Sequence, residues 1–305
     1  MNAITLHNIK KTYNKGAVLA VDQVSFEVKK GELFGLIGPD GAGKTSLFRI
    51  LTTLLLADSG TASVSGFDVV KDYKSIRGIV GYMPGRFSLY QDLTVKENLE
   101  FFATVFNTTI EENYELIREI YVQIEPFRDR RAGKLSGGMK QKLALCCALI
   151  HKPEVLFLDE PTTGVDAVSR REFWEMLQRL KVQGITILVS TAYMDEASLC
   201  DRIGLIQTGK LLSIDTPANI IHSYPEKLYA LKAADRYRLL KDARGFEHIH
   251  QCYSAGESLH ISFSDQDKLQ EKNLTDYLMK QGHSDIELSE IVPTIEDCFI
   301  RLISN

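Results

Sequence analysis

Residues 38–46 read Gly38-Pro39-Asp40-Gly41-Ala42-Gly43-Lys44-Thr45-Ser46, and this stretch decides how the rest of the chain is interpreted. Residues 32–37 before it form an apolar run of strand length, and residues 47–51 after it have the apolar spacing of a helix. The order is therefore strand, glycine loop, helix, the setting in which G-x-x-x-x-G-K-[ST] binds phosphate. Glycines let successive N–H groups point inward beside the positive end of the helix. An ordinary glycine turn is the alternative, which this context disfavours.

Two residues at the end of the loop have the side chains that a nucleoside triphosphate needs. Lys44 is placed to reach the β- and γ-phosphates. The hydroxyl of Thr45 is placed to ligate Mg²⁺. The sequence therefore predicts a site for a nucleoside triphosphate with its magnesium ion.

The composition limits the classes of protein to consider. The chain has 305 residues, 44% hydrophobic and 25% charged, which is ordinary for a soluble α/β protein with one large domain and a smaller appendage. Its net charge of −4 disfavours a general nucleic-acid binder. Apolar runs are too short to cross a bilayer, and residues 1–4 do not begin a secretory leader, so we expect a cytoplasmic location. The 5 cysteines, with Cys146 and Cys147 adjacent, fit reduced core thiols.

A second apolar strand, residues 155–158, ends in Asp159 and Glu160. Both carboxylates would lie at the carboxyl edge of a parallel sheet, where ligands bind in open α/β folds. Asp159 is placed to hold Mg²⁺ through water, and Glu160 to accept a proton from an attacking water. Two exposed acids at a strand end are the plain alternative, which the upstream phosphate loop disfavours.

A second glycine motif spans residues 135–141 and begins an apolar helix that continues through Ile150. Ser136 is a favoured N-cap, so an ordinary helix start is one interpretation. Gly137 and Gly138 favour a second one, because residues without Cβ expose N–H groups and the helix dipole to an anion approaching from outside.

Periodicity predicts the surrounding elements. Residues 94–123 have helical spacing and are interpreted as a helical insertion, whereas residues 58–60 are expected to form a turn. Strands are predicted at 202–207 and 210–214, around a turn at Thr208-Gly209. Tyr13 could stack on a nucleobase or simply pack at the surface.

From residue 223 the pattern is strand, helix, strand, strand, helix, strand, then a last helix over 294–303. That order is typical of a ferredoxin-like split βαβ unit. Thr294 is a plausible N-cap, with Asp297 at the capping-box position. His248 and His250 fit a surface pair better than a metal site.

Residues 1–222 resemble the nucleotide-binding domain of ABC transporters. The glycine loop resembles that family's Walker A motif, 155–159 its Walker B, 135–141 its signature and 163–166 its D-loop. The two glycine motifs look most like those of multidrug-type exporter subunits. The resemblance implies an α/β P-loop NTPase of the ABC type with a helical subdomain at about 86–150, plus a small α+β accessory domain at 223–305.

The resemblance also implies an ATP hydrolase with ATP and Mg²⁺ as cofactors, Tyr13 as the base-stacking residue and Glu160 as the catalytic base. Two such domains would close head-to-tail, so Ser136, Gly137, Gly138 and Gln141 would face the partner's ATP. An integral-membrane permease would hold the chain at the cytoplasmic face. The implied ATP-binding residues are Tyr13, Gly38, Pro39, Asp40, Gly41, Ala42, Gly43, Lys44, Thr45 and Ser46, with Thr45 and Asp159 toward the metal.

Two positions depart from the family pattern. Gly85 stands where a magnesium-binding glutamine is expected, and Ala192 where a histidine contacts the γ-phosphate. We hypothesise that this subunit's own site hydrolyses ATP slowly and that its signature completes a site on a non-identical partner. The alternative is a nearly inactive regulatory subunit that gates or scaffolds a catalytic partner. A soluble relative acting on ribosomes or DNA is disfavoured by the single nucleotide domain and the unremarkable charge.

Overall fold

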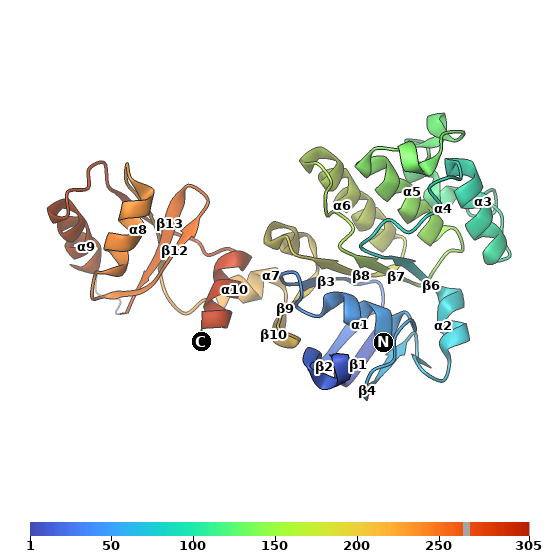
Figure 1. Cartoon of the computed structure of the whole chain (residues 1–305), viewed down its shortest axis with the longest axis horizontal. Coiled ribbons are helices and arrows are strands. Elements are labelled where there is room, and N and C mark those ends of the chain that lie inside the picture. Colours follow the sequence, from blue (N-terminus) through green and yellow to red (C-terminus); the bar gives the residue numbers. More distant parts are fainter. Residues whose placement is uncertain (265–268, 305) are drawn as a thin grey trace. The chain divides into compact units, whose positions relative to one another are not determined.

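The computed structural model describes residues 1–264 and 269–304. It divides into two compact units: residues 1–220 together with 302–304, and Ile221–Arg301. Figure 1 draws both. Every helix within the described residues is too short or too polar to span a bilayer.

A six-stranded sheet with the order β10-β9-β3-β8-β7-β6 forms the centre of the first unit. Its five strands other than β10 pair in parallel, which confirms the predicted α/β class. β10 pairs antiparallel with β9 around the predicted turn. The strands are β3 (Leu33–Ile37), β6 (Val80–Met83), β7 (Val155–Asp159), β8 (Thr186–Thr191), β9 (Arg202–Gln207) and β10 (Lys210–Asp215).

The parallel strands end at one edge of this sheet, and that edge gathers the predicted site residues. β3 leads into the glycine loop, and β7 ends at Asp159. β6 ends two residues before Gly85, and β8 ends one residue before Ala192. Because ligands bind at the carboxyl ends of parallel strands, these four segments define one candidate site.

A smaller antiparallel sheet has the order β2-β1-β4-β5. It consists of β1 (Asn2–Tyr13), β2 (Val18–Lys29), β4 (Ser59–Val64) and β5 (Phe67–Asp68). The expected turn at 58–60 is wrong for Ser59 and Gly60, because both lie in β4, which pairs with β1. In Figure 1 this sheet and α1 (Lys44–Leu51) lie on one face of the six-stranded sheet.

Helices α5 (Gly137–Leu149) and α6 (Ala167–Val182) cover the opposite face (Figure 1). The helical insertion is not continuous over 94–123, as periodicity suggested, but forms α3 (Val95–Val105) and α4 (Tyr114–Tyr121). Asn113, in the connection, donates from Nδ2 to the carbonyl of Ile150 at 2.8 Å, which ties this break to the end of α5. Short helices α2 (Tyr73–Ile79) and α7 (Pro217–His222) were not predicted.

The second unit is a four-stranded antiparallel sheet with the order β12-β13-β11-β14. Its core lies between the sheet and two helices, and Leu239, Leu259 and Leu274 are fully buried there. Chain order and strand order are those of a ferredoxin-like split βαβ unit. The elements are β11 (Leu228–Lys232), α8 (Arg236–Arg244), β12 (Ile249–Ala255), β13 (Ser258–Phe263), α9 (Leu269–Lys280), β14 (Glu287–Ile291) and α10 (Ile295–Ser304), of which residues 295–301 belong to this unit.

The contacts of the second unit bear on two local predictions, the capping box of the last helix and the surface position of His250. Thr294 and Asp297 form the predicted capping box, because each backbone N–H donates to the side chain of the other, at 2.7 and 3.3 Å. His250, one of the two histidines predicted to lie at the surface, is exposed, and its Nδ1 lies 2.8 Å from Oε1 of Glu226. All five cysteines of the chain are buried and free, as predicted.

Candidate functional site

The glycine loop has a backbone that only glycine fits at two of its positions. Gly43 has a φ of +104°, and a Cβ there would lie 2.2 Å from the carbonyl oxygen of Ala20. A Cβ on Gly38 would lie 2.1 Å from the carbonyl oxygen of Ile206. Neighbouring strands therefore pack directly against the loop backbone, which fixes its shape between β3 and α1.

Lys44 begins α1 and is only 3% exposed. Its Nζ donates to the carbonyl oxygens of Gly38 and Pro39 at 2.7 and 3.0 Å. The same atom lies 3.0 Å from Oε1 of Glu160. The structure thus brings together the lysine of the loop and the acid that follows β7, as the sequence predicted for one site.

Asp159 ends β7 as a buried carboxylate, 2% exposed. Its Oδ1 accepts a hydrogen bond from the hydroxyl of Ser190 at 2.7 Å. Our sequence interpretation did not single out Ser190. The available signal was a polar residue near the end of the apolar strand 185–190, but which strand lies beside β7 is a tertiary fact.

Tyr13 ends β1, and its hydroxyl lies 3.0 Å from Oγ of Ser46. The aromatic residue proposed to contact the base is therefore adjacent to the loop proposed to bind phosphate. Lys11 lies with its Nζ 5.9 Å from the centre of the Tyr13 ring. Stacking on a base remains a prediction.

The two positions that depart from the family pattern lie at this edge. A Cβ on Gly85 would lie 3.0 Å from the backbone oxygen of Asp159 and 3.8 Å from Cβ of Glu160. Position 85 thus lies beside the backbone of Asp159 and Cβ of Glu160, although it carries no side chain. Ala192 follows β8 immediately, beside Thr191, whose Oγ1 accepts the N–H of Tyr193 at 3.0 Å.

The second glycine motif begins α5, where Ser136 caps the helix by accepting the N–H of Met139 at 3.4 Å. This is the plain role that we considered for Ser136. Gly138 approaches the first turn of α6, because a Cβ there would lie 2.8 Å from Oγ of Ser169. Gly137 lies near the segment before α6, because a Cβ there would lie 3.6 Å from the oxygen of Gly164. Gln141, one turn further, lines the groove described below.

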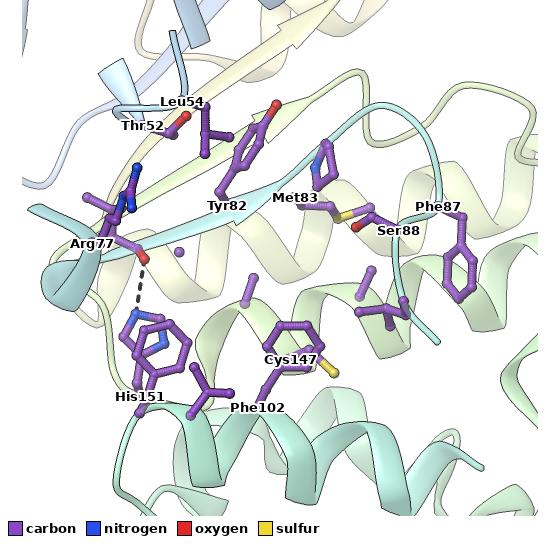
Figure 2. Close-up of a pocket in the computed structure, with 18 of the residues that line it drawn as sticks. Thr52, Leu54, Arg77, Tyr82, Met83, Phe87, Ser88, Phe102, Cys147 and His151 are labelled. Atoms are coloured by element: carbon purple, nitrogen blue, oxygen red, sulfur yellow. Dashed lines mark hydrogen bonds between the residues drawn. The ribbon is translucent and has the colours of Figure 1, made fainter. Parts of the chain in front are cut away.

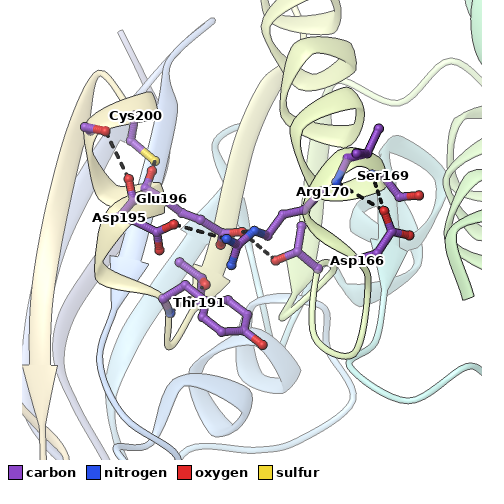
Figure 3. Close-up of polar contacts among 11 residues, drawn as sticks. Asp166, Ser169, Arg170, Thr191, Asp195, Glu196 and Cys200 are labelled. Atoms are coloured by element: carbon purple, nitrogen blue, oxygen red, sulfur yellow. Dashed lines mark hydrogen bonds and ion pairs between the residues drawn. The ribbon is translucent and has the colours of Figure 1, made fainter. Parts of the chain in front are cut away.

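Figure 3 shows a polar network that joins the segment after β7 to the segment after β8. Arg170, on α6, donates to Asp195 at 3.2 Å, and its guanidinium lies 4.8 Å from the centre of the Tyr193 ring. Glu196 is buried and accepts from Thr162 Oγ1 at 2.8 Å. These contacts hold the segment around Ala192 against the start of α6, which Asp166 caps.

An apolar groove of about 560 Å³ lies between the residues after β6 and helices α3 and α5. Figure 2 shows Met83 and Phe87 on one side, with Phe102 and Cys147 on the other. Val105, at the rim, is 56% exposed. His151 also lines the groove, where it forms a hydrogen bond with the carbonyl of Val80 at 3.0 Å and stacks on Phe106.

The chain matches the family described as "ABC transporter" over residues 21–163. It is 38% identical over 304 residues to "Probable multidrug ABC transporter ATP-binding protein YbhF" of Escherichia coli (strain K12), covering 98% of this chain and 52% of that protein. It is 34% identical over 304 residues to "Nod factor export ATP-binding protein I" of Rhizobium sp. (strain N33), covering 98% and 96%. The chain thus spans about half the length of the first relative and nearly all of the second.

A solved structure of an ATP-binding cassette has a fold similar to that of this chain. The "Dimeric structure of a post-hydrolysis state of the ATP-binding cassette MJ0796 bound to ADP and Pi" is similar with a TM-score of 0.63 and 25% identity. The similarity covers 70% of this chain and 98% of that one. The predicted P-loop fold of the ABC type is therefore confirmed.

Proposed function

Since the chain belongs to the ABC transporter family of ATP-binding proteins, we propose that it is the ATP-binding subunit of an export complex. Two relatives carry export or multidrug names, and one of them is matched over 96% of its length. We assign the nucleotide-binding domain to residues 1–222 and an accessory domain to 223–305, which the division of the fold after Ile220 supports. A separate permease would hold the chain at the cytoplasmic face of a membrane.

The residues at the sheet edge fit ATP with Mg²⁺. The hydroxyl of Thr45 is a hard oxygen ligand of the kind that Mg²⁺ prefers, and the carboxylate of Asp159 would hold the ion through water. When bound, the ion would neutralise charge on the phosphates. Lys44 and the loop N–H groups would bind the phosphates, and the ring of Tyr13 would face the base. Glu160 would orient the attacking water and accept its proton.

Gly85 carries the proposal that this chain's own site is weak. A Cβ there would lie 3.0 Å from the backbone oxygen of Asp159 and 3.8 Å from Cβ of Glu160, so a side chain would begin beside these two residues, and glycine supplies none. Ala192 likewise offers no hydrogen-bond donor. Because one preorganised donor in such a site contributes ~10²–10³ in rate, the chain's own pocket would bind ATP but hydrolyse it slowly.

The signature residues point to a second, non-identical nucleotide-binding domain as a partner. Ser136, Gly137, Gly138 and Gln141 match the family's pattern without a departure. They would complete a competent site whose Walker motifs belong to the partner. The partner then supplies most of the hydrolysis, and this chain supplies the face that closes over its ATP.

The groove between β6, α3 and α5 is the surface that we assign to the permease. It is mostly apolar and includes the exposed Val105 at its rim. A cytoplasmic helix of a membrane subunit could bury an apolar face there. Closing and reopening of the two nucleotide domains would pass to the permease through this contact.

The deciding measurement is ATP turnover by the purified chain and by the chain with its co-purified partners. We expect slow turnover alone and a large increase in the complex. Restoring the missing groups in Gly85→Gln with Ala192→His should raise the turnover of the isolated chain. Turnover of several per second by the native chain alone, abolished in Glu160→Gln, would show that its site is not degenerate.

A second function, a regulatory subunit, is favoured by the same two positions. In the complex, Glu160→Gln distinguishes the two functions. If the complex keeps its full turnover and transport with this variant, the chain only gates or scaffolds its partner. A fall in either means that the chain's own hydrolysis contributes.

A further inference from the structure

Ser190 contacts both acids of the candidate site with one hydroxyl group. It lies on β8 directly beside Asp159 of β7 in the parallel register. Its Oγ donates to Oδ1 of Asp159 at 2.7 Å and accepts the N–H of Glu160 at 3.0 Å. The side chain is fully buried, so water does not compete for these bonds. One donor and one lone pair of the hydroxyl are therefore both committed to the acids.

The first bond limits the rotation of the Asp159 carboxylate. A carboxylate held by one oxygen presents its other oxygen in a fixed direction. Partners of this kind, which orient a group of the metal site without touching the metal, set the geometry of that group. Ser190 thus fixes the acid that is assigned to the magnesium ion.

The second bond stabilises an unusual backbone at Glu160. Glu160 has a φ of +52°, the left-handed region, which costs a residue with a Cβ about 1–2 kcal/mol. Its N–H donates to both the carbonyl oxygen and the hydroxyl of Ser190, at 3.1 and 3.0 Å. This backbone conformation sets the direction in which the Glu160 side chain leaves the chain, and its carboxylate lies 3.0 Å from Nζ of Lys44.

We propose that Ser190 is a positioning residue that sets both acids for a Mg²⁺-bound nucleoside triphosphate. It supplies from β8 part of the preorganisation that Gly85 and Ala192 lack. The inference rests on the proposed function, because it needs the site to bind Mg-ATP. It adds a residue that acts through Asp159 and Glu160 and does not itself touch the nucleotide.

The test is calorimetry of ATP binding to the full chain, once with Mg²⁺ and once with EDTA. The Mg²⁺ gain is the ratio of the ATP affinity with Mg²⁺ to the ATP affinity in EDTA. In Ser190→Ala we expect the Mg²⁺ gain to fall by about 10- to 100-fold, the usual cost of losing such a partner. Affinity in EDTA should stay unchanged, since the loop and Lys44 are intact. Ser190→Thr, which keeps the hydroxyl, should restore the Mg²⁺ gain.

Thr186→Val is the matched control. Thr186 is a buried residue of the same strand whose Oγ1 accepts the N–H of Gly31 at 2.9 Å, at the opposite end of β8. Loss of that hydroxyl should leave the Mg²⁺ gain at the native value. An equal loss in both variants would mean that β8 merely needs its buried bonds, and would overturn a specific role for Ser190.

Ser190→Cys provides a second variant if the alanine chain does not fold. Cysteine nearly keeps the volume of serine, but its thiol is a weak donor, so the Mg²⁺ gain should again fall. A native Mg²⁺ gain in the alanine or cysteine variant overturns the proposal. A native chain that binds no Mg-ATP at all instead refutes the proposed function, and the role of Ser190 falls with it.

Discussion

Lys44 on α1 and Glu160 after β7 lie with Nζ and Oε1 3.0 Å apart, so the lysine proposed to bind phosphate and the proposed base meet at one point. In Glu160→Gln the proton acceptor is lost and the lysine keeps its charge. We expect turnover to fall by about 10²–10⁴, the contribution of a general base. ATP affinity should stay the same or rise, because a negative charge beside the phosphates is removed.

Phosphate release and a binding isotherm measure the two effects. Glu154→Gln is the control, because this exposed acid lies just before β7, at the far end from Asp159, and accepts from Ser65. Weaker ATP binding in Glu160→Gln than in the native chain would contradict the assignment of the lysine to the phosphates.

Gly43 should be the least replaceable residue of the loop. Gly43→Ala adds a Cβ 2.2 Å from the oxygen of Ala20 in a residue with a φ of +104°. Gly184→Ala is the matched control, with a φ of +89° and open space around the new Cβ. Both changes should cost the left-handed penalty of about 1–2 kcal/mol. Gly43→Ala should cost roughly 1–3 kcal/mol more, because the backbone must shift.

Urea unfolding followed by the fluorescence of Trp174, the single tryptophan, gives both free energies of unfolding. Equal destabilisation by the two variants would mean that the loop moves freely away from Ala20.

The groove should determine whether the chain binds the permease, and changes in it should leave ATP binding unaffected. Val105→Glu places a charge at its apolar rim, where the native side chain is 56% exposed. We expect co-purification with the permease to be lost, because a partner would have to bury the carboxylate. ATP binding should be unchanged. The control is Val122→Glu, on a residue 51% exposed at the end of α4 that does not line the groove.

Pull-down from detergent-solubilised membranes, with equal amounts of each variant, measures this effect. Loss of the permease in both variants, or in neither, would place the docking surface elsewhere.

The last helix should lose stability in acid. Burial by itself would raise the pKa of Asp297, but hydrogen bonds from Thr294, His260 and Tyr253 lower that pKa below its ordinary value of 3.8. A carboxyl group with a lowered pKa contributes its stability at every pH above the unfolded value. That contribution is lost as the pH falls below 3.8 and through the folded pKa.

Hydrogen exchange of the α10 amides, corrected for intrinsic rates, measures the effect in the full chain. In Asp297→Asn we expect α10 to be less protected at neutral pH, by about 1.5–3 kcal/mol for a lost hydrogen bond to a charged group, and to show little further loss in acid. Asp276→Asn, on an exposed residue of α9, should keep the native pH profile. A native profile in Asp297→Asn would mean that other groups cause the acid loss.

Local sequence determined the parts of this protein whose physical cause is local. A glycine loop between a strand and a helix, an apolar strand ending in two acids, and a Thr294–Asp297 cap each depend on residues close together in the chain. The same holds for the second unit, because the alternating and helical spacing of its apolar residues predicted the order of its strands and helices. These predictions are confirmed as structure, while the roles of the site residues toward ATP stay predictions.

Tertiary structure alone decided which of these segments meet. The strand at Ser59 and Gly60 forms because β1 supplies backbone partners, although the residues favour a turn. Ser190 matters because β8 lies beside β7, and Gly85 because its backbone lies against the carbonyl of Asp159. No local pattern encodes these distances, since strand order and close backbone approach arise from packing the whole sheet at once.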